Sequence, residues 1–327
     1  MNLKKLPKIM LNLNFESSVS YDDIKYYSSL NEDELKDELF FNDKDDINSY
    51  NKKINFAIDY LQTSNKLKKA AYDLALKLKE DNICYAEIVV TPRLHMKEEL
   101  SVETIINSIR NGFKAAEADK YNILIGVSKS ETIDYFYELG NIYQKYKDDG
   151  VCGISIIGES LVKRIYDYKN IFNYLNENEI PFAFNCDSYD TPDEMLVLVK
   201  NNVKRIIGGL NSMIDFAVMG EAILKRVLFV EQIKPLIVNK ELDSYMDDKI
   251  KNMLSSGANL AISINSLTIE NCDLTLEFEH LINCQMFTEE EILKMNKNAL
   301  IYSFLNVMDK QYLIEKIEKI KNLKKYQ

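Results

Sequence analysis

The sequence predicts an α/β fold, a single (β/α)8 TIM barrel with extra helices after strand one and at the C-terminus. Eight short, β-branched apolar runs alternate with amphipathic helical segments, a pattern that indicates parallel strands joined by right-handed crossovers. The length of 327 residues is one that α/β barrels routinely reach. A doubly wound open sheet is the alternative, but no glycine-rich phosphate turn follows the first strand.

The eight strands can be placed from their apolar runs and from the turn residues that bound them. Between them, residues spaced three and four apart form helical stripes. Ser64 and Ser101 are suitable N-caps, and Thr191 and Thr288 each begin a capping box. We expect the strands to begin near Ile9, Ile83, Tyr121, Val151, Phe182, Lys204, Val227 and Leu260.

Neither a linker nor an internal repeat interrupts this alternation, so we expect one domain over residues 1–327. The lysine-rich C-terminal tail, about 309–327, is predicted to be a solvated helix that packs on the outside of the barrel or is frayed.

Composition narrows the class of protein. The 46% hydrophobic and 28% charged residues are typical of a globular protein, and the net charge of −10 argues against binding nucleic acid or anionic membrane. No apolar run approaches a membrane span, and the N-terminus lacks the apolar core of a signal peptide. Five scattered cysteines without CxxC spacing suggest reduced thiols and a cytoplasmic location.

The first strand carries two amides, Asn12 and Asn14, on an otherwise apolar ribbon. Because strand side chains alternate, we expect Leu11, Leu13 and Phe15 on one face and both amides on the other. Two amides in a sheet interior cost free energy unless they meet partners, so the pair needs an explanation.

Chemistry in a barrel belongs at the C-terminal ends of the strands. Amides and small residues dominate these positions, and only Glu16, His95, Cys186 and Asp187 could titrate or ligate. The strand ends, in order, carry Asn12, Asn14, His95, Gly158, Asn185, Cys186, Asp187, Ser188, Gly208, Gly209, Asn265 and Ser266.

Several motifs, in order and spacing, make the chain resemble the adenosine/AMP deaminase family of metal-dependent (β/α)8 barrels, from residue 6 to about 305. The segments that carry the resemblance are Leu6-Pro7-Lys8, Tyr85-Ala86-Glu87-Ile88 with Pro92-Arg93-Leu94-His95, Asp148-Asp149-Gly150-Val151-Cys152-Gly153 before Gly158, Leu274-Thr275-Leu276-Glu277-Phe278, Asn298-Ala299-Leu300 and Ser303-Phe304-Leu305.

The resemblance implies which positions would carry the chemistry, and there the sequence departs from the family. The family's zinc ligands, three histidines and an aspartate, fall on Asn12, Asn14, Asn185 and Asn265. Its catalytic glutamate, its catalytic histidine and the second aspartate of a pair fall on Ser188, Gly208 and Ser266.

These departures predict a catalytically inactive, adenosine deaminase-like pseudoenzyme without zinc. Neutral amide oxygens are poor zinc ligands, and hydrolytic deamination needs a metal-activated water and a proton shuttle. Moreover, the chain has only two histidines, His95 and His280.

A nucleoside or other small polar ligand, a regulated protein partner or a homo-oligomer would suit such a protein. We favour mutual hydrogen bonding of the amides over a selected ligand-reading set. The candidates for a ligand pocket are Asn12, Asn14, Glu16, Gly158, Asn185 and Asn265.

Four other hypotheses about function remain open. Two of them are an active purine nucleoside (adenosine) deaminase-type hydrolase and a metal-free enzyme that reuses the barrel mouth. A Mg²⁺ or Ca²⁺ site on Glu16, Asp187 and amide oxygens is a third. The fourth is a nucleophile–base pair of Cys186 and His95.

Overall fold

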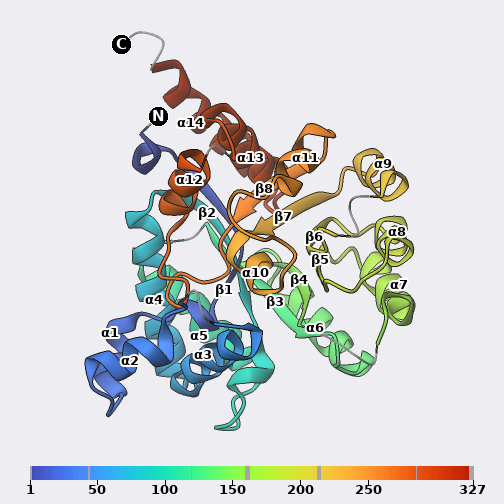
Figure 1. Ribbon diagram of the computed structural model, residues 1–327. Helices are drawn as coiled ribbons and strands as arrows, with labels where there is room; N and C mark the ends of the chain where they lie inside the picture. The colour runs from blue at the N-terminus through green and yellow to red at the C-terminus, as the bar shows by residue number, and fades with distance from the viewer. Residues whose placement is uncertain are drawn as a thin grey trace.

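The computed structural model describes residues 2–42, 45–118, 120–158, 163–211, 215–284 and 286–323, with side chains up to residue 317. Eight parallel strands pair in chain order from β1 to β8, surrounded by helices (Figure 1), which confirms the predicted barrel. Across the β8–β1 edge the Asn14 N–H donates to Asn265 O (2.8 Å), so the barrel is nearly closed. The strands are β1 Lys8–Asn14, β2 Ile83–Val90, β3 Tyr121–Ser128, β4 Val151–Ile157, β5 Phe182–Cys186, β6 Arg205–Gly208, β7 Leu228–Gln232 and β8 Asn259–Ser263.

The helices wrap the outside of the barrel, and α1 to α3 form the predicted extra layer after β1 (Figure 1). None of the described helices is long and apolar enough to cross a membrane. The α-helices are α1 Tyr21–Tyr27, α2 Glu32–Leu39, α3 Ile47–Tyr60, α4 Ser64–Glu80, α5 Val102–Ala115, α6 Ile133–Tyr146, α7 Lys169–Glu177, α8 Pro192–Lys200, α9 Phe216–Leu224, α10 Ile233–Val238, α11 Lys249–Ser255, α12 Leu274–Asn283, α13 Glu289–Ile301 and α14 Val307–Leu323, and the 3-10 helices are η1 Leu3–Lys5, η2 Glu16–Ser18, η3 Pro92–His95 and η4 Ile165–Tyr168.

Most of the predicted helix caps are present. Ser101 caps α5, and Thr191 and Thr288 form complete capping boxes at α8 and α13. The cap of α4 is Thr63, which accepts a hydrogen bond from the Lys66 N–H, so the prediction of Ser64 was wrong by one residue.

Strand β1 differs from its predicted alternation. Asn12 has φ of 56°, and the pairing with β2 shifts between Leu11 and Leu13. The bulge turns Leu11 into the barrel interior and Leu13 toward the helices, so they do not share a face as predicted. Asparagine tolerates this left-handed conformation better than most residues.

Two apolar layers form the core. One lies between the strands and the surrounding helices, and the other fills the barrel and its N-terminal end. Leu313 and Ile317 of α14 are buried in the inner layer, at 1% and 3% exposure. The C-terminal helix therefore packs against the barrel base through one face, while most of its other described side chains are partly or fully exposed, and residues 324–327 of the predicted tail lie outside the described residues.

A buried ion pair occupies the interior just above this base. Arg205 Nη1 lies 2.6 Å from Glu87 Oε2, and both side chains are fully buried. Tyr85 donates its hydroxyl to the other Glu87 oxygen (2.9 Å), and the guanidinium lies 4.3 Å above the Phe304 ring. These contacts hold opposite charges together where no water can screen them.

Candidate active site at the barrel mouth

A cavity of about 370 Å³ lies at the C-terminal ends of the strands, where barrel chemistry is expected. Five of the six predicted pocket residues line it, and Glu16 does not. The lining residues are Asn12, Asn14, Ile47, Tyr50, Asn51, Ile54, Val89, Thr91, Leu94, Ile157, Gly158, Asn185, Cys186, Asp187, Gln232, Asn239 and Asn265.

The two amides of β1 are held by different groups and not by each other. Asn12 Oδ1 accepts from Arg205 Nη1 (2.7 Å), and its Nδ2 donates to Ser155 Oγ (3.3 Å). Asn14 Oδ1 accepts from the Ser17 N–H (2.9 Å). Asn12 thus connects the ion pair in the barrel interior to the mouth.

Asn265, which follows β8, belongs to a polar chain that leads away from the pocket. Its Nδ2 donates to the Tyr50 hydroxyl (2.8 Å), which in turn donates to Glu270 Oε1 (3.0 Å). Burial, together with the nearby Glu277 carboxylate, raises the pKa of Glu270 to about 8. A buried carboxyl with a pKa of about 8 is therefore hydrogen-bonded to Tyr50, a residue that lines the cavity.

Asn185 on β5 and Gln232 on β7 are two further amides that line the pocket. Gln232 donates its Nε2 to Asn12 O (3.0 Å) and Ile264 O (3.2 Å), which ties β1 and the end of β8 to β7. Asn185 Oδ1 is buried and has no hydrogen-bond partner among the described residues. The four predicted amides therefore do share the pocket, but the favoured mutual hydrogen bonding is not what holds them.

Asp187 is the carboxylate among the lining residues. Lys129, just beyond β3, places its Nζ 2.6 Å from Asp187 Oδ2, and both side chains are less than a tenth exposed. The neighbouring Cys186 thiol lies 3.2 Å from the Met195 sulfur, and burial raises its pKa well above the ordinary value. A thiol that resists ionisation is a poor nucleophile.

Glu16 and His95 form a separate buried pair behind the pocket. His95 Nε2 lies 3.0 Å from Glu16 Oε1, its Nδ1 lies 3.0 Å from Leu61 O, and both side chains are fully buried. Glu16 and Asp187 thus have different partners, so the structure does not assemble the hard-cation site, and His95 is not paired with Cys186.

The three positions that correspond to catalytic residues of the family lie outside the lining set. Ser188 is exposed, and Gly208 has φ of 70° at the end of β6. Ser266 is fully buried, and its hydroxyl donates to Ser17 O and accepts from the Ile269 N–H (2.9 Å). Ser266 therefore supports the loop after β8.

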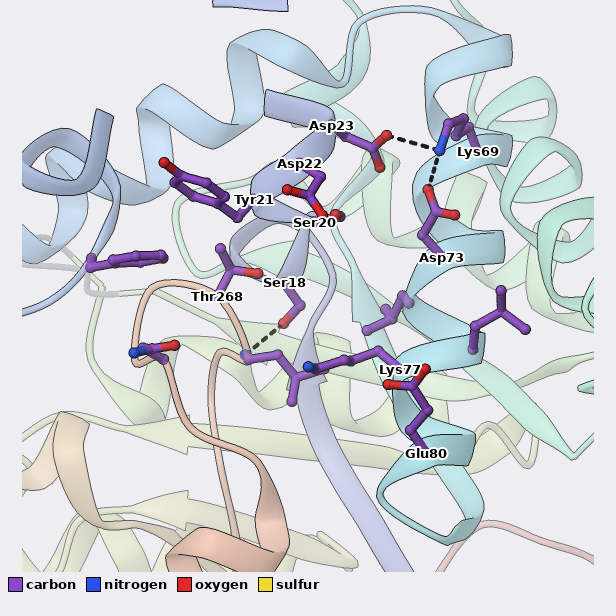
Figure 2. A pocket seen from close by; sticks show the side chains of 15 residues that line it. Ser18, Ser20, Tyr21, Asp22, Asp23, Lys69, Asp73, Lys77, Glu80 and Thr268 are labelled. Atoms are coloured by element: carbon purple, nitrogen blue, oxygen red, sulfur yellow. Dashed lines mark hydrogen bonds and ion pairs between the residues drawn. The ribbon is translucent and has the colours of Figure 1, made fainter. Parts of the chain in front are cut away.

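A second cavity, of about 560 Å³, lies beside the barrel among η2, α1, α4 and the loop after β8 (Figure 2). Lys69 bridges two carboxylates there, at 2.9 Å from Asp23 Oδ1 and 2.5 Å from Asp73 Oδ2. The Lys69 side chain is 56% exposed. This outer cavity is therefore charged and open to solvent, whereas most of the polar side chains that line the mouth pocket are neutral amides.

Sequence reasoning missed four residues of the mouth. Lys129 directly follows β3 and Gln232 is the last residue of β7, so a complete inspection of the strand ends would have included them. Tyr50 and Glu270 come from polar connecting segments far apart in the chain, and nothing in the sequence brings them together.

Eight parallel strands with a polar pocket at their carboxyl ends define a barrel protein with a small-molecule site at its mouth. The comparisons with known proteins name the family. The family model described as adenosine deaminase matches residues 25–320, so the chain belongs to the adenosine deaminase family.

Relatives and solved structures are similar to this protein over most of its length. An adenosine deaminase of Enterococcus faecalis is 23% identical over 97% of this chain and 97% of its own length. The structure of Arabidopsis ADAL complexed with IMP aligns with TM-score 0.85 at 16% identity, covering 97% of both chains. A Burkholderia ambifaria amidohydrolase with bound Zn aligns with TM-score 0.86 at 12% identity, covering 98% of this chain and 92% of the other.

Two predictions from the sequence are contradicted by these findings. An inactive pseudoenzyme does not fit a chain whose relatives, matched over nearly their full length, are named adenosine deaminase. The predicted lack of zinc does not fit a zinc-dependent family with a zinc-bound structural neighbour. Both predictions rested on the side chains at the positions that the resemblance implies and on the count of two histidines, which do not by themselves establish the absence of a reaction.

The residues at the family's ligand positions nevertheless do not match the donors that zinc prefers. Asn12, Asn14, Asn185 and Asn265 offer neutral amides, and Asn12 Oδ1 and Asn14 Oδ1 already accept hydrogen bonds. We therefore derive no step through a metal at these four side chains.

Proposed function

We propose that this chain is a hydrolase of the adenosine deaminase class that acts on an aminopurine nucleoside or nucleotide bound at the barrel mouth. Family membership over residues 25–320 carries the proposal. The mouth cavity of about 370 Å³ falls in the range of small-molecule sites, and its polar amides suit a heterocyclic base. A cytoplasmic location is part of the proposal and is supported by five free cysteines.

The pocket's own residues indicate how the base would be held. Asn14 and Asn265 approach it from β1 and from beyond β8, while Asn185 and Gln232 approach from β5 and β7. Because these side chains come from separate strands of one rigid barrel, they can contact several edges of a flat ligand at once.

Asp187 is the group we assign to proton transfer. In hydrolytic deamination, a water oxygen bonds to the amine-bearing ring carbon, the C–N bond breaks and ammonia leaves. The water supplies one proton to the departing nitrogen and one to the ring. Asp187 can carry the first of these protons, and its contact with Lys129 (2.6 Å) fixes its position.

The test is a conversion assay on the purified protein. Adenosine, AMP and adenine are each incubated with it, with and without added Zn²⁺, and ammonia and the oxopurine product are measured. We expect conversion of at least one compound and a loss of about 100-fold or more in Asp187→Asn. Asp193→Asn, an exposed carboxylate at the start of α8, is the matched control and should keep wild-type activity.

Two results would count against this function. If none of the three compounds is converted under either condition, the hydrolase proposal fails. If Asp187→Asn is as active as Asp193→Asn, the assignment of proton transfer to Asp187 fails while the hydrolase class stands.

A further inference from the structure

Asn239 places a carboxamide at the mouth from the end of α10. It is the C-cap of that helix, it lines the cavity, and it is partly exposed. Its side chain makes no hydrogen bond to the other described residues, whereas those of Asn12, Asn14 and Asn265 do. An accessible amide without an internal partner can both donate to a ligand and accept from it.

The chain leaves α10 through a tight turn that fixes the place of Asn239. The Lys240 N–H donates to Ile237 O (3.0 Å). The Glu241 N–H donates to Leu236 O (2.9 Å). With Lys240 at φ of 59°, these two hydrogen bonds form a Schellman motif. Lysine adopts this φ less readily than glycine, so we expect a contact outside the turn to help hold it.

The Glu241 side chain supplies such a contact. It reaches the loop after β6, where its Oε2 accepts a hydrogen bond from the Leu210 N–H (3.0 Å). Both residues are buried, so the bond is shielded from competition with water. Lys249 of α11 donates its Nζ to Glu241 O (2.6 Å), which holds the backbone of the same residue. One carboxyl group thus joins the segments that follow β6 and β7.

The loop after β6 is itself packed closely against a residue of the mouth. Gly208 and Gly209 have φ of 70° and 74°, and a Cβ at Gly209 would lie 2.6 Å from Cys186 Cβ. Only glycine allows this approach to Cys186, which lines the cavity. Leu210 therefore follows a fixed point of the barrel, and its hydrogen bond to Glu241 ties the end of α10 to that point.

We propose that Glu241 is the positioning residue that holds Asn239 at the mouth, where Asn239 contacts the nucleoside. The inference rests on the proposed function and adds to it a residue that acts on the ligand only through another residue. The site needs a hydrogen-bond acceptor more than it needs a charge. Burial raises the pKa of Glu241 to about 7, so a neutral side chain with an acceptor oxygen suits this position.

Amide hydrogen exchange at Leu210, followed by NMR, tests the hydrogen bond between the two segments. Glu241→Leu removes the acceptor, and we expect the Leu210 amide to exchange about tenfold faster under conditions where denaturant titration shows the variant to be folded. Glu241→Gln keeps an acceptor and should retain the protection of wild type.

Glu231→Leu is the matched control, because it makes the same chemical change at a neighbouring carboxyl. Glu231 is fully buried, the charge of Glu241 contributes to raising its pKa after burial itself, and neither of its oxygens has a hydrogen-bond partner among the described residues. Its replacement removes no hydrogen bond, so the Leu210 amide should exchange as in wild type.

Steady-state assays with adenosine test the effect on the mouth. KM should rise about tenfold in Glu241→Leu and stay within about twofold of wild type in Glu241→Gln and Glu231→Leu. Asn239→Ala should raise KM by a similar factor. The double variant of Glu241→Leu with Asn239→Ala should be no worse than either single variant, because both changes remove the same contact.

Each outcome decides the inference. A wild-type KM in Glu241→Leu, even with faster Leu210 exchange, would confine Glu241 to the fold and overturn the inference. Additive effects in the double variant, or a KM in Glu241→Gln as high as in Glu241→Leu, would also overturn it, and the proposed function would stand in each case. If wild type does not convert adenosine, the proposed function fails for this nucleoside and the role of Asn239 fails with it, while Leu210 exchange still shows whether Glu241 makes its hydrogen bond.

Discussion

The interior of the barrel and its mouth bury polar groups in opposite ways. Inside, Arg205 and Glu87 are charged, fully buried and paired at 2.6 Å, and α13 and α14 pack on the base below them. At the mouth the amides are uncharged, and Asn185 Oδ1 has no partner among the described residues. Paired charges inside favour one arrangement of the strands, whereas the neutral amides of the mouth line the cavity where a barrel is expected to bind its ligand.

The largest expected effect comes from breaking the interior pair. Arg205→Met leaves Glu87 buried without its counter-ion, and we expect the free energy of unfolding to fall by about 3–5 kcal/mol in denaturant titration. Replacing both residues, as in Arg205→Met with Glu87→Met, should cost less than the single change. A single variant with wild-type stability would show that the pair does not hold the interior together.

Asn12 joins the two regions, and its substitution separates two contributions. Asn12→Leu loses the hydrogen bond to a charged partner and places a branched residue at φ of 56°, so we expect a loss of about 2–4 kcal/mol. Asn12→Gly loses the same hydrogen bond but adopts this φ freely, so it should be the more stable of the two. Equal stability of the two variants in denaturant titration would show that the bulge carries no strain.

Asn12 and Arg205 also show how much of the structure could be predicted from the sequence. The alternation of apolar runs placed all eight strands, because the burial of parallel strands leaves a local signature. The bulge at Asn12 and the partnership with Arg205, 193 positions away, leave none. At the mouth the amides were found from their strand-end positions, but the chain from Asn265 through Tyr50 to Glu270 depends on folding and was missed.

The pH dependence of stability probes the hydrogen-bonded series from Asn265 through Tyr50 to Glu270 at the mouth. Burial raises the pKa of Glu270 from the ordinary 4.5 to about 8, so the folded protein keeps a proton that the unfolded chain has released. The free energy of unfolding should therefore fall as pH rises from about 4.5 toward about 8, by at most about 1.4 kcal/mol per pH unit from this group.

Glu270→Gln isolates that contribution, since it removes the titration and keeps a neutral polar side chain. Denaturant titrations across the same pH range should give a flatter profile for the variant. Parallel profiles for wild type and variant would mean that Glu270 does not titrate in this window.

The smallest effect is expected in the outer cavity of Figure 2, where charge is exposed. Lys69→Met should change the free energy of unfolding by only about 0–1 kcal/mol, because the Lys69 side chain is 56% exposed and water screens its charge. It should also leave adenosine binding unchanged, which calorimetry can measure. Weaker adenosine binding in this variant would move the ligand site from the mouth to the outer cavity.

A crystal structure of the protein soaked with adenosine, with the product inosine in a parallel soak, tests the central claim most directly. The account predicts a purine base in the mouth pocket, within hydrogen-bond distance of at least one of the amides that line it. A purine found in the outer cavity beside Lys69, with none in the mouth pocket, would contradict it.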